Sequence, residues 1–379
     1  MSAPSCRPTF VEVNLAAIAH NLREIKKQVA PAEIMAVVKA DAYGHGLKEV
    51  SKTAIENGVC YLGVARLEEG VILRENNFDA NILVFGGFFE SQIEDFLKFG
   101  LELTLYDMYL AKALSEKAKQ LGKTAKVHIK VDTGMGRVGV AWQKAADFVQ
   151  DVVELNHLEI VGIYTHFANA DEKDKSFAHT QLKRFNHALT RLDEKQIEIP
   201  LKHAANSGAI LDLPESYFDM VRPGVMMYGY YPSLETSETV AIEPSMSIKS
   251  RVILIKEVEE GTPISYGLTF RAKQKTKIAT VPFGYGDGFN RLLSNKGEVL
   301  IQGQRFPVVG RVTMDQIMVE VGAESAVQTG DEVVLLGRQG REEITIHEIC
   351  KKLNTIPYEV TCWVSERIPK VYKSMWNEF

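Results

Sequence analysis

The sequence predicts an α/β protein with an N-terminal (β/α)8 TIM-type barrel and a C-terminal mostly-β domain. Three observations predict it: eight short apolar runs in the first 225 residues, amphipathic segments between them, and a series of strand-like runs after Tyr231. Near-continuous apolar strands that alternate with helices are typical of parallel sheets covered on both faces. Eight such units fit a closed barrel, although periodicity alone also allows an open, doubly wound sheet.

The expected strands are short, and the segments between them have a helical pattern. In "DMYLAKALSEKAKQLG" apolar residues recur every three or four positions, and Gly122 marks the end of the helix. In chain order the expected strands are residues 34–40, 61–65, 82–86, 101–106, 126–132, 159–167, 200–206 and 219–225.

The residue pattern changes in the last third of the chain, from alternating strand and helix patterns to mostly strand-like runs. Residues 232–244 are polar and contain two prolines, which is typical of a linker. Beyond them, runs such as "RVILIKEV" and "DEVVLLG" are separated by turn residues, and only "IHEICKKLN" has a helical pattern. We therefore expect a barrel domain over residues 1–240 and a β domain over 241–379, with the first ten residues able to pair with the β domain.

Composition excludes several classes of protein. A net charge of −5 gives no basic surface for nucleic acid, and no stretch has the roughly 20 apolar residues of a membrane span. The N-terminal segment lacks the apolar core of a secretory signal. Four scattered cysteines are typical of free thiols in a reducing compartment, and nine histidines form no HxxxH pair. We expect a cytoplasmic protein without a metal site.

The segment "IMAVVKADAYGHG", residues 34–46, places Lys39 directly after an apolar strand. Burying an ammonium costs several kcal/mol unless something compensates it, although lysines also stand at ordinary strand ends. Other expected strands end in polar residues as well, and in a barrel these ends share one face, where active sites lie. Each residue alone has an ordinary structural explanation. Together they are Lys130, Asp132, Arg137, His166, His203, Asn206, Ser207, Arg222 and Gly224.

The last two strand ends favour a phosphate. Loops after strands seven and eight commonly bind phosphate in such barrels. "NSGAIL" offers Ser207 as a helix cap, and Gly224 allows close backbone approach. A phosphate there and an amine at Lys39 predict pyridoxal 5'-phosphate, which takes a lysine as its covalent partner. Lys39 would then no longer be a free ammonium.

A family resemblance rests on nine segments between about residues 10 and 370. They are "AVVKADAYGHG", "KVDTGMGRVG", "YTHFANAD", "HAANSG", "VRPGVMMYG", "SYGLTF", "PFGYGDG", "GRVTMDQ" and "YEVTC". In order and spacing they resemble the motifs of bacterial alanine racemase. The resemblance implies a barrel with a C-terminal β domain, a homodimer whose active sites are built from both subunits, and interconversion of L- and D-alanine that supplies D-alanine for peptidoglycan.

The resemblance also implies a role for each matching barrel residue. Arg222 faces the pyridine nitrogen and keeps its own proton, so the ring is a weaker electron sink and side reactions are suppressed. Arg137 binds near the phenolic oxygen and the substrate carboxylate, and Lys130, carbamylated in many relatives, orients it. The implied cofactor-binding residues are Lys39, Tyr43, Arg137, His166, Ser207, Arg222, Gly224 and Tyr358. Of these Tyr43, Ser207, Gly224 and Tyr358 contact the phosphate.

The second domain matches the remaining family positions. Tyr266 matches the second catalytic base, donated by the partner subunit to the site that contains Lys39, and the backbone N–H of Met314 faces the substrate carboxylate. Two departures, Gly286 where alanine is usual and Thr313, touch no catalytic group. The narrow access corridor of the family is matched by Asp171, Tyr285, Arg291, Arg311, Ile356 and Tyr358.

Three other functions stay open at this point. A serine or broad-spectrum amino-acid racemase would share the fold, although Tyr358 and Ile356 crowd the corridor and favour alanine. A non-catalytic cofactor carrier with a similar barrel would lack the C-terminal β domain. A decarboxylase of the related barrel-plus-β fold would need a glycine-rich phosphate loop and a cysteine–aspartate pair, and the sequence has neither.

Overall fold

The computed structural model describes residues 7–373, which divide into two compact units. One unit comprises Ile18–Ala42 and Leu47–Glu243 and is called the barrel unit. The other comprises, among the described residues, 7–17, Tyr43–Gly46 and 244–373, and is called the β unit.

The barrel unit is built on parallel strands. Within the described residues eight of them form one sheet in the order β10-β2-β3-β4-β5-β6-β8-β9. Each of the eight predicted runs overlaps one of these strands. Their bounds are β2 Glu33–Val37, β3 Tyr61–Val64, β4 Asn81–Val84, β5 Glu102–Leu105, β6 Ala125–Asp132, β8 Leu158–Tyr164, β9 Leu201–His203 and β10 Met220–Val221. A short strand, β7 (Val140–Ala141), adds to the end of β6.

Two backbone hydrogen bonds join the last strands of this sheet. Asp219 N–H donates to the carbonyl of Lys202 at 3.0 Å, and Arg222 N–H donates to that of Ala205 at 2.9 Å. Strands β9 and β10, at the two ends of the sheet order, are thereby linked, and the barrel is nearly closed. The open, doubly wound alternative is wrong, and the predicted barrel is confirmed.

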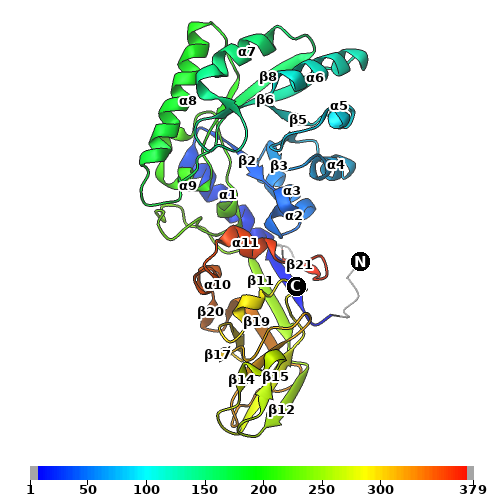
Figure 1. Ribbon diagram of the computed structural model, residues 1–379, viewed down its shortest axis with the longest axis vertical. Helices are drawn as coiled ribbons and strands as arrows, with labels where there is room; N and C mark the ends of the chain where they lie inside the picture. The colour runs from blue at the N-terminus through cyan, green and yellow to red at the C-terminus, as the bar shows by residue number, and fades with distance from the viewer. Residues whose placement is uncertain (1–6, 374–379) are drawn as a thin grey trace. The chain divides into compact units, whose positions relative to one another are not determined.

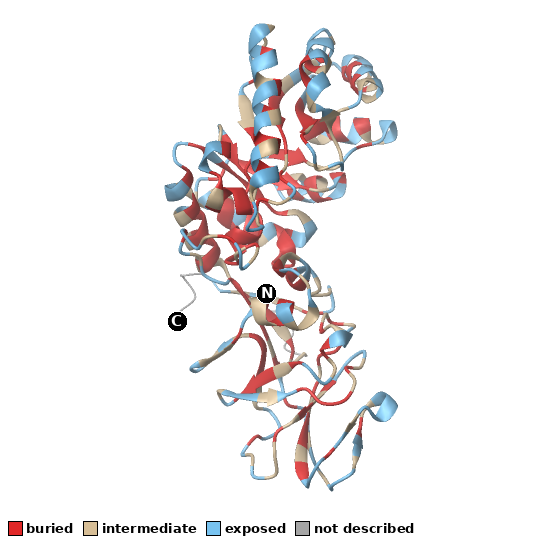
Figure 2. Cartoon of the chain, turned by 60° about the vertical axis from the view of Figure 1, so that its left-hand side comes forward, coloured by how far each residue is buried: buried red, intermediate tan, exposed pale blue. Residues whose placement is uncertain are grey.

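Amphipathic helices follow the strands and lie on the outer side of the sheet (Figure 1). In α6 the N-cap Asp107 accepts a hydrogen bond from Leu110 N–H, and every third or fourth residue is buried. Figure 2 shows the result for the barrel unit: strands are buried and outer helix faces are exposed. The helices are α1 Leu15–Val29, α3 Leu47–Glu56, α4 Leu67–Glu75, α5 Ile93–Phe99, α6 Met108–Gln120, α7 Ala145–Val153, α8 Ser176–Glu194 and α9 Ser207–Asp212.

The barrel interior is partly apolar and partly polar. Met35, Tyr61, Leu83 and Met220 form a buried cluster with Phe85 and Leu201 packed against it. Barrels of this type are usually filled by Val, Ile and Leu. Here buried polar side chains complete the interior, and each needs a hydrogen-bonding partner. They are Glu102, Thr104, His128, Lys130, His203 and Arg222.

The β unit contains three sheets within the described residues. The largest has the order β17-β16-β19-β11-β1-β21 with β20 on β19, and β12-β15-β18 and β13-β14 form the others. Strand β1 pairs antiparallel with β11 and parallel with β21, so the start of the chain belongs to this unit. The strands are β1 Phe10–Asn14, β11 Met246–Arg251, β12 Leu254–Val258, β13 Pro263–Ile264, β14 Phe270–Arg271, β15 Thr276–Val281, β16 Glu298–Ile301, β17 Gln304–Pro307, β18 Ile317–Glu320, β19 Glu332–Gln339, β20 Glu342–Ile344 and β21 Lys370–Lys373.

In the described part of the β unit two α-helices lie beyond residue 244, where the sequence predicted one. Helix α10 (Ile346–Leu353) is the predicted one, capped by Thr345, whose side chain accepts from Glu348 N–H. Helix α11 (Pro357–Cys362) was not predicted. At six residues it is too short to show a helical period, although Pro357 at its first turn is a start signal. In the part of the chain that is described, no helix has the length and apolar character needed to cross a membrane.

Candidate active site

A left-handed turn follows the first barrel strand and begins at Lys39. In α2 (Lys39–Tyr43), Ala40, Asp41, Ala42 and Tyr43 have φ between 52° and 54°. Each such residue costs about 1–2 kcal/mol because its β-carbon crowds the carbonyl oxygen. Strain of this kind persists where the surroundings enforce it, and it is typical of functional sites.

Side-chain and backbone acceptors hold this turn. Ala40 N–H donates to Glu69 at 2.6 Å, and Leu47 N–H donates to Asp41 at 2.7 Å. Ala42 N–H donates to the carbonyl of Val38 at 2.8 Å. The turn fixes the backbone of Lys39 at the carboxyl end of β2, where the sequence placed it.

Arg222 is the buried cation of the barrel unit and is only 4% exposed. Its guanidinium donates to the carbonyls of Thr165 at 2.7 Å and Ala204 at 2.9 Å. It also donates to Nδ1 of His203 at 2.9 Å and approaches Nδ1 of His166 at 3.4 Å. Burial lowers the pKa of Arg222 to about 10, so it remains charged at neutral pH.

The charge of Arg222 acts on its basic neighbours. Burial first, and the Arg222 charge second, hold the pKa values of His166 and His203 well below the ordinary histidine value. Both imidazoles are therefore neutral at physiological pH. The same two causes lower the pKa of Lys130 to about 7.

Tyr164 packs among these groups, and sequence reasoning gave it no role. Its ring stacks on His203 with 4.8 Å between centroids, and Lys130 Nζ and Arg222 Cζ lie 5.2 Å and 5.3 Å from its centroid. Its hydroxyl lies 2.8 Å from that of Thr104, and burial raises the pKa of Tyr164 to about 12. The signal was available, because Tyr164 is two positions before the predicted His166, the spacing at which side chains of an extended segment share a face.

Two of the predicted phosphate residues, Ser207 and Gly224, come together at the start of α9, but with one correction. The helix cap is Asn206, whose side chain accepts from Ala209 N–H at 3.0 Å, so the predicted capping role of Ser207 is wrong. Ser207 Oγ instead accepts from Gly224 N–H at 2.9 Å. A β-carbon at Gly208 would lie 2.8 Å from the backbone of Ala170, so this helix start requires glycine.

Tyr266 and Met314 lie in the β unit on loops that are bonded to their neighbours. Tyr266 is 72% exposed and begins a single turn, Tyr266–Leu268, while Ser265 donates from Oγ to the carbonyl of Arg311 at 2.6 Å. Met314 is 52% exposed, and its carbonyl accepts from Gly286 N–H at 2.9 Å. These two hydrogen bonds fix the backbone next to Tyr266 and at Met314.

A buried carboxylate, Asp287, supports these loops and was missed by sequence reasoning. It lies 2.6 Å from the guanidinium of Arg7 and 3.4 Å from that of Arg367. Arg367 also binds Asp315 at 2.6 Å, next to Met314. The aspartate of "GYGDG" therefore ties the loop before it to the loop that contains Met314.

Tyr43 and Tyr358, both predicted phosphate ligands, lie in the β unit as a tilted aromatic pair with 5.9 Å between ring centroids. Burial raises the pKa of Tyr43, so its hydroxyl stays protonated and can donate a hydrogen bond. The pairing keeps these two predicted residues together.

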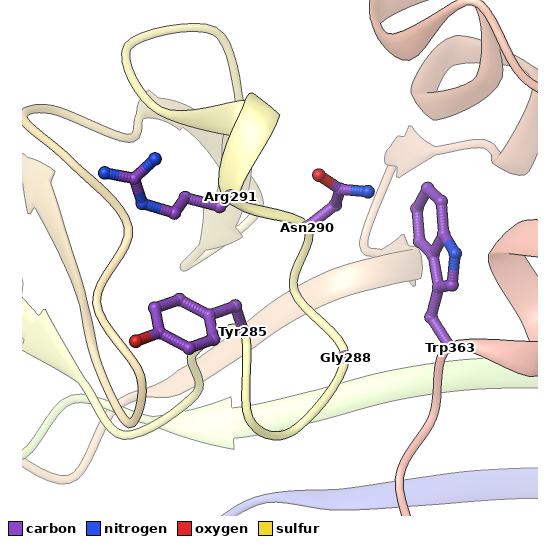
Figure 3. A pocket seen from close by; sticks show the side chains of 5 residues that line it. All are labelled: Tyr285, Gly288, Asn290, Arg291 and Trp363. Atoms are coloured by element: carbon purple, nitrogen blue, oxygen red, sulfur yellow. The ribbon is translucent and has the colours of Figure 1, made fainter.

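A pocket of about 330 Å³ in the β unit contains two predicted corridor residues. In Figure 3, Tyr285 and Arg291 point to the same side, and Trp363 stands across from them. The lining residues are Tyr285, Gly288, Asn290, Arg291 and Trp363.

The predicted site residues are thus divided between the two units. The barrel unit contains Lys39, Lys130, Arg137, His166, Ser207, Arg222 and Gly224, with Arg137 exposed on the loop after β6. The β unit contains Tyr43, Tyr266, Met314 and Tyr358. A lysine, neutral imidazoles and a buried arginine at the carboxyl ends of barrel strands define a barrel enzyme of the type that works on small anionic substrates or cofactors.

Comparison with known proteins identifies the family. The chain matches the models of the alanine racemase N-terminal domain over residues 13–232 and of the alanine racemase C-terminal domain over residues 245–372. Alanine racemase 2 of Caldanaerobacter subterraneus subsp. tengcongensis is 48% identical over 368 residues, covering 97% of this chain and 95% of that protein. The chain belongs to the alanine racemase family and is a racemase, an isomerase, as the resemblance predicted.

Solved structures agree with this assignment. Alanine racemase of Clostridium difficile 630 has a TM-score of 0.93 at 40% identity, over 98% of this chain and 97% of that one. Histidine racemase of Leuconostoc mesenteroides subsp. sake has a TM-score of 0.90 at 28% identity, over 99% of this chain and 100% of that one. The fold is therefore shared by racemases named for different amino acids.

The lowered pKa of Lys130 makes a prediction about stability. Between pH 7 and the ordinary lysine value of 10.5, the unfolded chain binds a proton that the folded chain does not, so wild-type stability rises with pH in this window. At pH 6.5 the folded state contains a buried charge, and Lys130→Met should raise its stability by about 1–4 kcal/mol. The gain should shrink towards pH 9, measured by urea unfolding in bicarbonate-free buffer.

Lys126→Met is the matched control, because Lys126 is exposed on the same strand. It should change stability little at either pH. A Lys130→Met protein that is less stable than wild type at pH 6.5, or a difference that does not vary with pH, would contradict the assignment.

Proposed function

We propose that this protein interconverts L-alanine and D-alanine with pyridoxal 5'-phosphate, using Lys39 and Tyr266 as bases on opposite faces of the substrate. One observation supports this most: the carboxyl end of the barrel joins the Lys39 turn, the buried Arg222, and the Ser207–Gly224 contact in one unit. The family assignment supports the substrate. D-alanine for peptidoglycan is the proposed use of the product.

The residues present fit the cofactor. A buried guanidinium fits an unprotonated ring nitrogen, because arginine donates and does not give up its proton. The start of α9, with Gly208 in close backbone contact, and the neighbouring Gly224 fit a phosphate. Lys39 would hold the cofactor covalently, with Arg137 and His166 beside its ring and Tyr43, Ser207, Gly224 and Tyr358 at its phosphate.

Racemisation needs a proton to leave one face of the α-carbon and another to arrive on the opposite face. When bound, the cofactor would delocalise the negative charge that forms on the α-carbon. Lys39 would take or give the proton on one face through Nζ, and Tyr266 on the other through Oη. Arg137 and the backbone N–H of Met314 would hold the substrate carboxylate, so that the α-proton faces one base or the other.

Lys130 is proposed to react with carbon dioxide and become a carbamate. A pKa of about 7 leaves much of its amine neutral at physiological pH, and the neutral amine is the reactive form. A negative carbamate would then stand among Arg222, Arg137 and the Tyr164 ring in place of a disfavoured cation. Its charge would orient Arg137.

A homodimer with shared active sites is the proposed assembly. The single chain leaves Tyr266, Met314 and Ile356 exposed by 72%, 52% and 53%, so these predicted site residues are available to a second copy. A second copy would cover them, so that the barrel of one chain and the β unit of its partner form each site. The domain boundaries at residues 240–241 and the cytoplasmic location stay predictions.

A serine or broad-spectrum racemase is the second candidate. The histidine racemase with the same fold favours keeping it, because this fold alone does not fix the amino acid. Ile356 and Tyr358 at the predicted corridor favour the smaller alanine.

A substrate panel with chiral product analysis tests the function. Purified protein with pyridoxal phosphate should convert L-alanine to an equal mixture of enantiomers, and L-serine and L-histidine more slowly by at least about tenfold, since extra atoms must fit the same corridor. Lys39→Ala is the inactive control. Faster racemisation of serine or histidine, or an unchanged L-alanine solution, would contradict the proposal.

Mixing two inactive variants tests the shared site. Lys39→Ala and Tyr266→Ala subunits, unfolded together and refolded, should recover roughly a quarter of wild-type activity, since half of the dimers are mixed and each has one intact site of two. Each variant refolded alone gives the background. Recovery no greater than this background would show that each site is built within one chain.

A further inference from the structure

A chain of buried hydrogen bonds runs from Arg222 through the barrel interior to a carboxylate. Arg222 donates to His203 Nδ1 at 2.9 Å, and His203 Nε2 lies 3.0 Å from His128 Nδ1. His128 Nε2 lies 2.8 Å from Glu102 Oε2. All four side chains are buried, with exposures of 4% for Arg222, 0% for both histidines and 3% for Glu102.

The direction of every bond in this chain follows from its first member. Arginine has only donors, so His203 Nδ1 must accept and its proton must lie on Nε2. His203 then donates to His128 Nδ1, and the proton of His128 lies on Nε2, from which it donates to Glu102. The reverse direction is excluded, because it would place two N–H groups face to face between His203 and Arg222. The last bond ends on a Glu102 oxygen, which accepts, so two neutral imidazoles satisfy every position.

Other groups around this chain of hydrogen bonds agree with the assigned bond directions. The low pKa of His203 keeps its ring neutral. Glycine at position 162 leaves the space that the His128 ring occupies, because a β-carbon there would collide with this ring.

The residue types alone could suggest a metal site, and the geometry does not support one. Within residues 7–373 no three His, Cys, Asp or Glu side chains are arranged to hold a metal ion. The outer nitrogen of His203 faces a guanidinium, which repels a cation.

We propose that Glu102 is a positioning residue for Arg222: through His128 and His203 it fixes the imidazole tautomers that hold the guanidinium in one orientation. The inference rests on the proposed function, in which Arg222 faces the cofactor ring. Without Glu102, the Nε2–H of His128 would lose its acceptor, and the tautomers that let His203 accept from Arg222 would lose that support.

The first test reads the tautomers directly. The full chain labelled with ¹⁵N-histidine, with and without pyridoxal phosphate, should show His128 and His203 as neutral Nε2–H tautomers, with His128→Gln and His203→Gln used for assignment. In Glu102→Leu one or both rings should change tautomer, and in Glu102→Gln, whose amide oxygen still accepts, they should not. A wild-type His203 found as Nδ1–H or as a cation would overturn the inference.

The second test measures the consequence for the cofactor and for turnover. Glu102→Leu should weaken pyridoxal phosphate binding and lower kcat on the order of a hundredfold, as for a misplaced active-site group, with a smaller change in KM. Glu102→Gln should lose less than about tenfold, because the tautomers survive. Ser115→Ala, which removes a buried hydroxyl bonded to the Asn156 carbonyl elsewhere in the barrel unit, is the control for a general loss of packing.

The outcomes separate this inference from the proposed function. If Glu102→Leu has the turnover and cofactor affinity of the wild type, the positioning role of Glu102 is wrong. The proposed racemase function is not affected by that result. A wild-type protein with both predicted tautomers but no racemase activity would instead overturn the proposed function. If Glu102→Leu fails to fold, the wild-type tautomers and the Glu102→Gln kinetics still decide the inference.

Discussion

A guanidinium charge buried inside the barrel is the constraint on which the rest of the candidate site depends. Arg222 is held by two backbone carbonyls and an imidazole, and it remains charged at neutral pH. After burial itself, its charge is the next cause of the low pKa values of His166, His203 and Lys130. The barrel end therefore combines a permanent buried cation with two neutral imidazoles and a lysine of lowered pKa. A site of this kind suits an anionic ligand whose ring must accept a hydrogen bond without a proton.

Two strained or crowded backbone segments position the chemistry around that charge. Four successive left-handed residues set the start of the Lys39 turn, and Glu69 and Asp41 hold them with their carboxylates. At α9 only glycine fits at position 208, because the backbone of Ala170 lies against it. The left-handed turn costs stability, and function is the reason that best explains why the fold retains it.

The barrel and the β domain could be predicted from the sequence, but only some of the side-chain contacts inside the barrel could. Eight apolar runs were enough for the barrel strands, and strand-end positions were enough to group Arg222 with His166 and Ser207. Ser207 was taken for a cap because "NSG" offers two capping residues, and the preceding Asn206 has the cap geometry. Glu102 and His128 were missed because a strand's alternation shows which side chains face inward, not which of them meet across a barrel. Their pairing depends on strand order and register, which only the structure provides.

Borohydride trapping tests most directly the claim that this barrel end is a pyridoxal phosphate site anchored on Lys39. The full-length protein would be loaded with cofactor, reduced, digested and mapped by mass spectrometry. The account predicts one adduct, on the peptide that contains Lys39, and none in Lys39→Ala. A stoichiometric adduct on Lys130 or on another lysine, or no adduct after loading, would contradict it.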